Sequence, residues 1–326
     1  MSSHPKSSHP DPSDLFGPAA EPPDEPPLDP AFVVDFQAYE DDLSPGQRWT
    51  TWYAVEPLSR GPEPRPDWVV TSAGAVDTEL GILKTGKEAD VFLLERADPH
   101  DPGGGVVLAA KRYRDTGHRD FHRSAAYTEG RGTRRTRDQR ALKRKSTWGR
   151  TVATGEWAVA EWDALVRMWQ LGVAVPYPVQ IDGTEILMEW VTGLDGESAP
   201  RLAQTRPAPD LLRSYYDQLV EAMARMVQAG LVHGDLSAYN LLATGERLVV
   251  IDLPQMVDLV GNPAGMDFLL RDCTNVCAWF RSRGLAVDEQ ELFGELMAHA
   301  FRPHSAVVDP DPLQRARCGG LGTTAA

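Results

Sequence analysis

The order of apolar patterns along the chain limits what it can fold into. Strand-like segments dominate the first half, and segments with apolar residues at helical spacing dominate the second half. The predicted strands cover 81–95 (two arms around a Gly-Lys-Glu turn), 105–114, 185–191 and 247–257, and the predicted helices cover 156–172, 211–230 and 268–284. We therefore predict an α+β fold with two lobes, a small β-rich lobe followed by a helical lobe.

Composition separates this core from both ends of the chain. Residues 1 to about 48 are rich in Pro, Ser, Asp and Glu and cannot bury enough apolar surface to offset the entropy of ordering, so we predict disorder there. The predicted domain covers 49–302, with a small lobe at about 68–188 and a large lobe at about 192–302, and 303–326 is predicted to be a flexible tail. With no membrane-length apolar run and no secretory signal, we expect a cytoplasmic protein without membrane contacts.

Aromatic and sulfur-containing residues have a simpler expected role. We predict that Trp49, Trp52 and Trp68 pack under the small lobe rather than form an exposed contact surface. Cys273 and Cys277 lie on one helix face without further soft ligands nearby, which favours buried packing over metal binding.

The segment LVHGDLSAYNLL, residues 231–242, places a His, an Asp and an Asn between two apolar dipeptides. Polar groups so placed are costly to bury without partners, which is often the mark of a functional loop, and an ordinary turn is the alternative. In phosphoryl transfer, the spacing of Asp235 and Asn240 supplies an acceptor near the attacking oxygen and an amide oxygen for a metal. Asp252 ends the apolar strand LVVI, where Mg²⁺ bridging phosphates would satisfy its charge, although a capping or turn role is the simpler alternative.

Two features of the first half complete a possible phosphate site. The glycine in the turn Thr85-Gly86-Lys87-Glu88-Ala89 lets backbone amides approach a phosphate, although most glycines between strands form plain hairpin turns. Lys111 follows an apolar strand and can act as a point charge on the α- and β-phosphates of ATP if a carboxylate holds its ammonium. Glu161 is the best candidate for that partner, and Glu156 is its nearest rival. Together these sites predict a nucleotide-phosphate site.

This combination resembles the RIO family of atypical protein kinases, most closely its RIO1 branch, from about Trp68 to Gly284. TGKEADV is similar to the phosphate loop of that family, LVHGDLSAYNLL to its catalytic loop, VVIDLPQMV to its metal-binding segment, and FLLRDCTNVCAWF to the helix that closes the domain. The resemblance implies a two-lobed protein-kinase-like fold whose reduced helical C-lobe lacks the usual activation segment. Asp90 departs from the family pattern, since many relatives have Asn there.

The resemblance also implies an ATP- and Mg²⁺-dependent serine/threonine protein kinase and assigns roles to individual residues. Asp235 would be the catalytic aspartate, and Asn240 and Asp252 would hold Mg²⁺. In RIO enzymes the metal-binding aspartate has been proposed to take up phosphate, so Asp252 is the candidate phospho-acceptor of an ATPase-like cycle. The remaining roles are Lys111 on the α/β-phosphates, Glu161 as its brace, Gly86, Lys87 and Glu88 in the phosphate loop, Met188 as gatekeeper, and the hinge Glu189 to Val191 at adenine.

Two other hypotheses remain open on the sequence alone. A small-molecule kinase of the aminoglycoside or choline phosphotransferase type shares the His-Gly-Asp-x-x-x-x-Asn pattern, and Ser237 fits it, whereas the Gly-Lys-Glu-Ala loop and IDLPQ favour the RIO family. A nucleotide-gated scaffold that binds RNA or a ribosomal subunit is suggested by residues 111–150. There 14 Lys or Arg accompany 4 Asp or Glu, a local charge of +10 in a chain of net charge −14. A solvated loop is the alternative explanation of that stretch.

Overall fold

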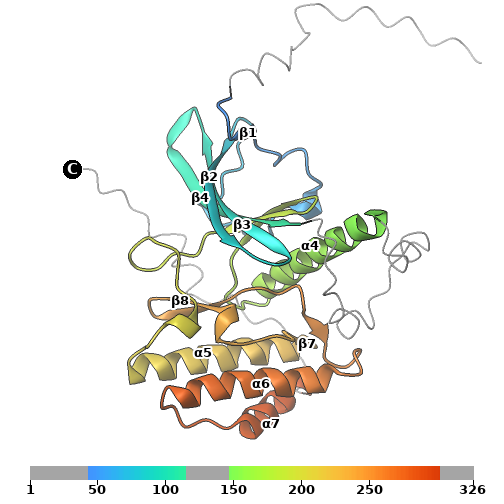
Figure 1. Cartoon of the computed structure of the whole chain (residues 1–326), viewed down its shortest axis with the longest axis vertical. Coiled ribbons are helices and arrows are strands. Elements are labelled where there is room, and N and C mark those ends of the chain that lie inside the picture. The colour runs from blue at the N-terminus through green and yellow to red at the C-terminus, as the bar shows by residue number, and fades with distance from the viewer. Residues whose placement is uncertain (1–42, 115–146, 302–326) are drawn as a thin grey trace, which may run out of the picture. The chain divides into compact units, whose positions relative to one another are not determined.

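The computed structural model describes residues 43–114 and 147–301 (Figure 1). The small lobe is a six-stranded antiparallel sheet in the order β1-β2-β3-β4-β6-β5, and α4 lies beside it. The elements are β1 (Gln47–Trp49), β2 (Val76–Thr85), β3 (Ala89–Asp98), β4 (Asp101–Tyr113), α4 (Thr147–Gln170), β5 (Pro178–Asp182) and β6 (Glu185–Glu189). The predicted hairpin around the Gly-Lys-Glu turn is formed by β2 and β3.

Within the described residues, the large lobe is built from three α-helices, two short 3₁₀ helices and two short β-ribbons (Figure 1). Its elements are α5 (Pro209–Gln228), β7 (Leu231–Val232), β8 (Leu241–Thr244), β9 (Arg247–Val250), β10 (Val257–Asp258), α6 (Gly265–Ser282) and α7 (Glu289–Ala300). Strand β7 pairs with β10, and β8 pairs with β9. Between Asp252 and α6 the chain forms only β10, so the predicted two-lobed α+β fold with a reduced C-lobe is confirmed.

Apolar side chains explain why the segment before β2 belongs to the small lobe. Trp52 is buried in a cluster with Leu94, Leu108 and Tyr177, and Trp68 packs against the same cluster, which confirms the predicted packing of these two tryptophans. In the large lobe, Cys273 and Cys277 are fully buried on α6, as predicted. Among the described residues, no helix is both long and apolar enough to span a bilayer.

Several predicted boundaries differ from the structure. Strand β1 begins at Gln47, ahead of the predicted domain start at 49, because its short backbone pairs with β2 and needs no apolar pattern of its own. Helix α4 begins at Thr147 rather than 156, through a stretch of weak helix formers. Strand β9 ends at Val250 rather than 257.

Helix α7 was not predicted, although Asp288 caps it by accepting from the amides of Gln290 (2.8 Å) and Glu291 (3.0 Å). Residues 1–42, 115–146 of the basic stretch, and the tail 303–326 lie outside the described part.

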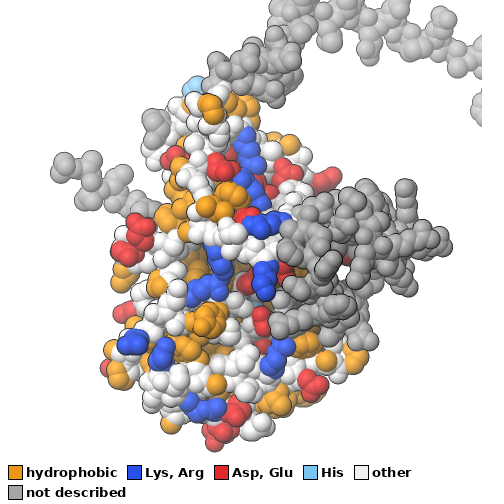
Figure 2. All heavy atoms as spheres, viewed as in Figure 1, with side chains coloured by type: hydrophobic (Ala, Val, Ile, Leu, Met, Phe, Trp, Pro, Cys, Tyr) orange, Lys and Arg blue, Asp and Glu red, His pale blue; other side chains and the backbone are white. Residues whose placement is uncertain are grey.

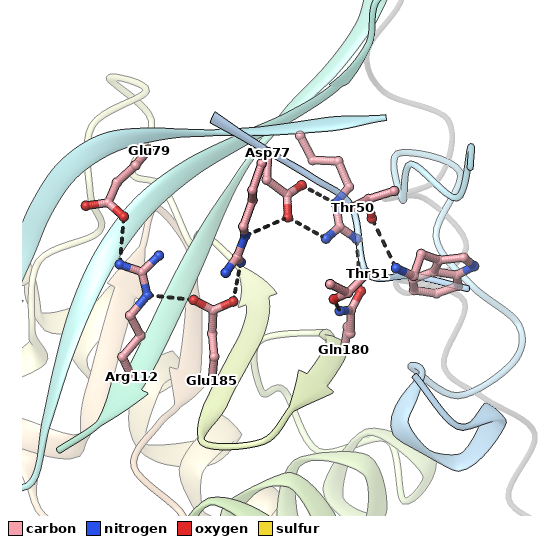
Figure 3. A network of polar contacts seen from close by, with 10 residues as sticks. Thr50, Thr51, Asp77, Glu79, Arg112, Gln180 and Glu185 are labelled. Atoms are coloured by element: carbon pink, nitrogen blue, oxygen red, sulfur yellow. Dashed lines mark hydrogen bonds and ion pairs between the residues drawn. The ribbon is translucent and has the colours of Figure 1, made fainter. Parts of the chain in front are cut away.

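A polar network lies on one face of the small-lobe sheet (Figure 3). The side chain of Arg96 is fully buried, and its Nε and Nη2 donate to Asp77 at 2.6 and 2.9 Å while its Nη1 donates to Gln180 at 3.2 Å. Farther along the sheet, Arg112 links Glu185 to Glu79. Removing one partner of a buried ion pair leaves an uncompensated charge, so the network holds the strands in register. Successive side chains alternate between faces of a strand, so Lys111, the residue before Arg112 in β4, points to the opposite face.

Candidate active site

Lys111 joins the two lobes. It lies near the end of β4, and its side chain is 15% exposed. Its Nζ donates to Oε1 of Glu161 on α4 at 2.6 Å and to Oδ1 of Asp252, just after β9, at 3.1 Å. Three residues selected from separate sequence motifs therefore meet at one ammonium group. The rival carboxylate, Glu156, is exposed on α4.

The charges at this contact stabilise one another. Desolvation opposes the positive charge of Lys111, but attraction to Glu161 and Asp252 outweighs it and raises the pKa of the lysine. The same lysine lowers the pKa of Asp252 below its usual range. Glu161 is buried and also accepts a hydrogen bond from the Tyr113 hydroxyl. Lysine and aspartate are therefore both charged at neutral pH. Figure 2 shows basic and acidic side chains interspersed over the middle of this face.

Asp252 has an unusual backbone. Its φ is +66°, and among the described residues it is the only non-glycine residue with positive φ. Such left-handed conformations are costly for residues with a Cβ and concentrate at functional sites. The side chain is 49% exposed, and the preceding amide, of Ile251, donates to the carbonyl of Asn240 at 3.0 Å. The turn ends β9 and directs the carboxylate toward Lys111.

The catalytic-loop candidates lie beside Asp252. Asn240 is buried, and its Nδ2 donates to the backbone carbonyl of Asp235 at 2.9 Å. This bond uses the amide nitrogen and leaves the Oδ1 atom of Asn240 as the acceptor that a metal needs. The side chain of Asp235 is 53% exposed, with Nη2 of Arg271 at 4.0 Å. The loop therefore presents a carboxylate to solvent and keeps the asparagine fixed beneath it.

Two buried residues to which the sequence analysis assigned no role hold this loop. Asp272 on α6 accepts from the amides of Gly234 and Leu236, both at 2.8 Å and on separate oxygens. His233 lies with its Nε2 3.2 Å from the carbonyl of Ile251, and its Nδ1 accepts from the amide of Asp235 at 3.3 Å. The backbone on both sides of Asp235 is therefore fixed by buried groups. The only sequence signal for Asp272 is an acidic residue on the buried face of a helix.

Changing Asp272 tests this support. Asp272→Asn keeps the shape but has one acceptor oxygen instead of two, so one buried amide loses its partner at a cost of about 1–3 kcal/mol. We expect kcat for ATP turnover to fall by about 5- to 100-fold with little change in KM. Steady-state kinetics measures this, with thermal unfolding as the check that the variant folds.

The same residue predicts a pH effect. Burial raises the pKa of Asp272 to about 6, and protonation would replace an acceptor by a donor. We expect wild-type kcat to decline as pH falls through about 6, and this component to be missing in Asp272→Asn. Identical pH profiles for the two proteins would contradict the assignment.

The predicted phosphate loop is a tight turn. The Gly86 amide donates to the carbonyl of Ala89 at 3.0 Å, and a Cβ at Gly86 would lie only 2.7 Å from that oxygen, so glycine is required. Lys87 and Glu88 are exposed in the turn. Partial desolvation and repulsion by Asp252 raise the pKa of Glu88, which indicates that its carboxylate is near the Lys111 contact.

Some backbone groups of the predicted hinge already make hydrogen bonds within the fold. The backbone amide of Glu189 donates to the carbonyl of Tyr177 at 2.9 Å, so this donor is already used. The Val191 carbonyl accepts from the amide of Ala199 at 3.0 Å. One donor and one acceptor of the predicted hinge, Glu189 to Val191, are therefore already used within the fold. Met188, the proposed gatekeeper, is partly buried and packs against the main apolar core.

The donor set fits one class of metal. Asp252 and Asn240 offer hard oxygen atoms, and the described residues contain no cluster of three or more His, Cys, Asp or Glu that could hold a metal without help. Mg²⁺ is commonly bound by one or two protein oxygens, with substrate phosphates and water completing its octahedron. The residues therefore fit Mg²⁺ that arrives with a nucleotide, and they fit poorly a metal held by protein alone.

Comparison with known proteins identifies the family. Residues 101–292 match the RIO domain family. The chain is 36% identical over 220 residues to the RIO-type serine/threonine-protein kinase Rio1 of Haloferax volcanii, covering 68% of this chain and 69% of that protein. It is 30% identical over 225 residues to Rio1 of Methanocaldococcus jannaschii, covering 69% and 70%. The human serine/threonine-protein kinase RIO1 is 30% identical over 223 residues, but the match spans only 36% of its length.

Solved structures show a looser similarity. A Rio2 kinase–ADP/Mg²⁺–phosphoaspartate complex from Chaetomium thermophilum matches with a TM-score of 0.46 at 22% identity, covering 66% of this chain and 61% of that one. A second Rio2 kinase structure from that organism has a TM-score of 0.48 at 22% identity, covering 68% and 63%. The domain match over more than half of the chain, and the archaeal relatives matched over more than two thirds of their length, show that this chain belongs to the RIO family of serine/threonine-protein kinases.

Proposed function

We propose that this chain binds ATP with Mg²⁺ where its two lobes meet and transfers the γ-phosphoryl group. It would act as a RIO-type serine/threonine kinase, or as an ATPase that passes through a phosphorylated Asp252. The observation that carries the proposal is the contact of the Lys111 ammonium with both Glu161 (2.6 Å) and Asp252 (3.1 Å). This contact supports the proposal, because phosphoryl transfer between two lobes would need a small-lobe cation close to a carboxylate of the large lobe.

Nucleotide binding would use the groups described above. Lys111, braced by Glu161, would contact the α- and β-phosphates, and the tight turn at Gly86 would bring backbone amides near the phosphates. The hinge, Glu189 to Val191, would offer backbone groups to adenine. Asn240 and Asp252 would hold Mg²⁺, which when bound neutralises charge on the phosphates.

Transfer to a protein hydroxyl would use Asp235. Its carboxylate accepts the proton of the attacking hydroxyl, the oxygen bonds to the γ-phosphorus, and the bond to the β–γ bridging oxygen breaks, so that ADP leaves with the electron pair. In the ATPase cycle, a carboxylate oxygen of Asp252 attacks the γ-phosphorus and ADP leaves. Water then hydrolyses the resulting acyl phosphate, which releases phosphate and restores the aspartate.

Incubation with γ-labelled ATP tests the proposal and separates the two cycles. Acid-stable label on protein indicates a seryl or threonyl product, whereas hydroxylamine-labile label that is absent from Asp252→Asn indicates an aspartyl phosphate. Transfer to aminoglycosides or choline, with none to protein or water, would replace this proposal by the small-molecule kinase hypothesis. If no ADP forms with Mg²⁺ present, the proposed activity is wrong.

We also propose that the basic stretch 111–150 contacts RNA or a ribosomal subunit. Its local charge of +10 supports this partner, since Lys and Arg side chains neutralise phosphates and release counterions. Binding to ribosomal RNA that weakens steeply between about 50 and 200 mM salt is the expected result. Binding that is absent, or insensitive to salt, would remove this partner.

A further inference from the structure

Lys84 is an exposed lysine near the end of β2, one residue before the turn that begins at Thr85. In the sheet register it pairs with Val91 of β3, and Val91 in turn pairs with Lys111 of β4. Directly paired residues of antiparallel strands project from the same face of a sheet. Lys84 therefore points to the face on which Lys111 meets the large lobe, two strand spacings or about 10 Å along the sheet.

Arg201 comes to this region from the large lobe. Its Nη1 donates to the backbone carbonyl of Tyr239, in the 3₁₀ turn Ala238–Asn240 of the catalytic loop. Its backbone forms an isolated β-bridge with Leu242, directly after that turn begins β8, and the residue is partly buried. The guanidinium is therefore held against the loop that carries the candidate catalytic aspartate.

The two cations act on each other across the space between the lobes. Partial burial, followed by repulsion from Arg201, lowers the pKa of Lys84. Asp252 attracts the same ammonium, and Lys111 repels it. Among the described residues, neither Lys84 nor Arg201 forms an ion pair with a carboxylate. Because like charges gathered at one place repel, an anion bound among these cations would remove a cost that the protein alone leaves unbalanced.

We propose that Lys84 and Arg201 form a phosphate clamp, with one cation from each lobe, that contacts the phosphate chain of the bound nucleotide beside Lys111. Each would donate charge-assisted hydrogen bonds to phosphate oxygens. The favoured ligand is a nucleoside polyphosphate and not an acidic protein, because Lys84 adjoins the predicted phosphate loop and shares the sheet face of Lys111. This inference rests on the proposed nucleotide site.

Removing either cation tests the clamp. Lys84→Gln and Arg201→Gln are each expected to raise the Kd of Mg²⁺·ATP by about tenfold, since each removes one charge-assisted contact. The double variant should raise it by about thirty- to a hundredfold, because contacts made from opposite lobes are largely independent. Adenosine lacks phosphates, so its Kd should change by less than about twofold in all three variants. Calorimetric titration gives both constants, and thermal unfolding checks each variant.

Charge-conserving variants separate charge from local structure. Lys84→Arg and Arg201→Lys should keep the Kd of Mg²⁺·ATP within about threefold of wild type, because each retains a cation at its position. A loss in Arg201→Lys as large as in Arg201→Gln would show that the contact with Tyr239 matters and the charge does not. A matched control is Arg213→Gln, the same substitution at an exposed position of α5, which should stay within about twofold of wild type.

The outcomes distinguish this inference from the proposed function. If wild type binds neither Mg²⁺·ATP nor adenosine, the nucleotide site itself is wrong. If wild type binds Mg²⁺·ATP and both Gln variants bind it equally well, the clamp is wrong, and a rise confined to KM for a protein substrate would assign these cations to that substrate instead. Equal losses for ATP and adenosine, or a double variant no weaker than the single ones, also overturn the clamp. Should Arg201→Gln fail to fold, Lys84→Gln at its exposed strand end still decides the matter.

Discussion

Asp235→Ala is expected to lower ATP-dependent phosphoryl transfer by about 10²–10⁴-fold, the usual contribution of a positioned general base. The Kd for Mg²⁺·ATP should change by less than about threefold. The side chain is half-exposed, while its backbone is held separately by Asn240 and His233. Removing the carboxylate therefore removes the proton acceptor and leaves the loop in place.

Rapid measurement of ADP formation together with nucleotide titration checks both halves of this expectation. Asp217→Ala provides a matched control, because Asp217 is an exposed aspartate on α5. It should retain wild-type turnover and binding. Turnover of Asp235→Ala within a few-fold of wild type would show that the assigned role is wrong.

Asp252→Asn is expected to abolish the effect of Mg²⁺ on ATP binding and to lower turnover by at least about a hundredfold. The substitution removes the charge that pairs with Lys111 and would hold the metal. Asn is suited to the test because it tolerates the left-handed backbone seen at φ +66°, whereas Ala would add strain. The measurement is the ATP Kd with Mg²⁺ and with EDTA.

Asp252→Gly separates charge from backbone conformation. Glycine adopts positive φ without cost, so this variant should be at least as stable as Asp252→Asn near the turn and equally insensitive to Mg²⁺. If Mg²⁺ still tightens ATP binding to Asp252→Asn as strongly as to wild type, Asp252 is not a metal ligand.

The residues that meet at Lys111 were accessible from sequence because chemistry constrained them. A lysine after an apolar strand needed a carboxylate, and the structure places Glu161 at 2.6 Å from it. Asp252 was selected because a carboxylate at the end of an apolar strand needs a cation, and it lies at 3.1 Å from the same ammonium. In both cases the cost of an unpaired charge limited the solutions.

Supporting residues were missed because their partners lie on other elements of the fold. Asp272 lies far along the chain from the amides of Gly234 and Leu236, and no local spacing relates a helix residue to two loop amides. Arg114 looked like one more cation of the basic stretch. Only the antiparallel pairing of β3 with β4 brings it to Asp90. Such contacts depend on the packing of separate elements and leave no periodic signal.

The ends of helices and strands could be predicted only where the local sequence carries a pattern or a cap. The three residues of β1 show no alternation, since their hydrogen bonds come from β2. The N-terminal part of α4 is poor in strong helix formers, so only the later turns were predicted. The cap at Asp288 was readable and marks the start of α7.

The ammonium of Lys111 has two alternative partners, the carboxylate of Asp252 and the phosphates of ATP. At present it fastens β4 to the turn after β9, yet the same group is expected to serve the phosphates of ATP. A contact between this ammonium and phosphate would weaken its contact with Asp252. Binding of ATP and the direct contact between Lys111 and Asp252 are therefore expected to oppose each other. By thermodynamic linkage, a change that weakens the direct contact between Lys111 and Asp252 is expected to favour ATP, and ATP with Mg²⁺ would then replace that contact by an indirect link between the same two residues.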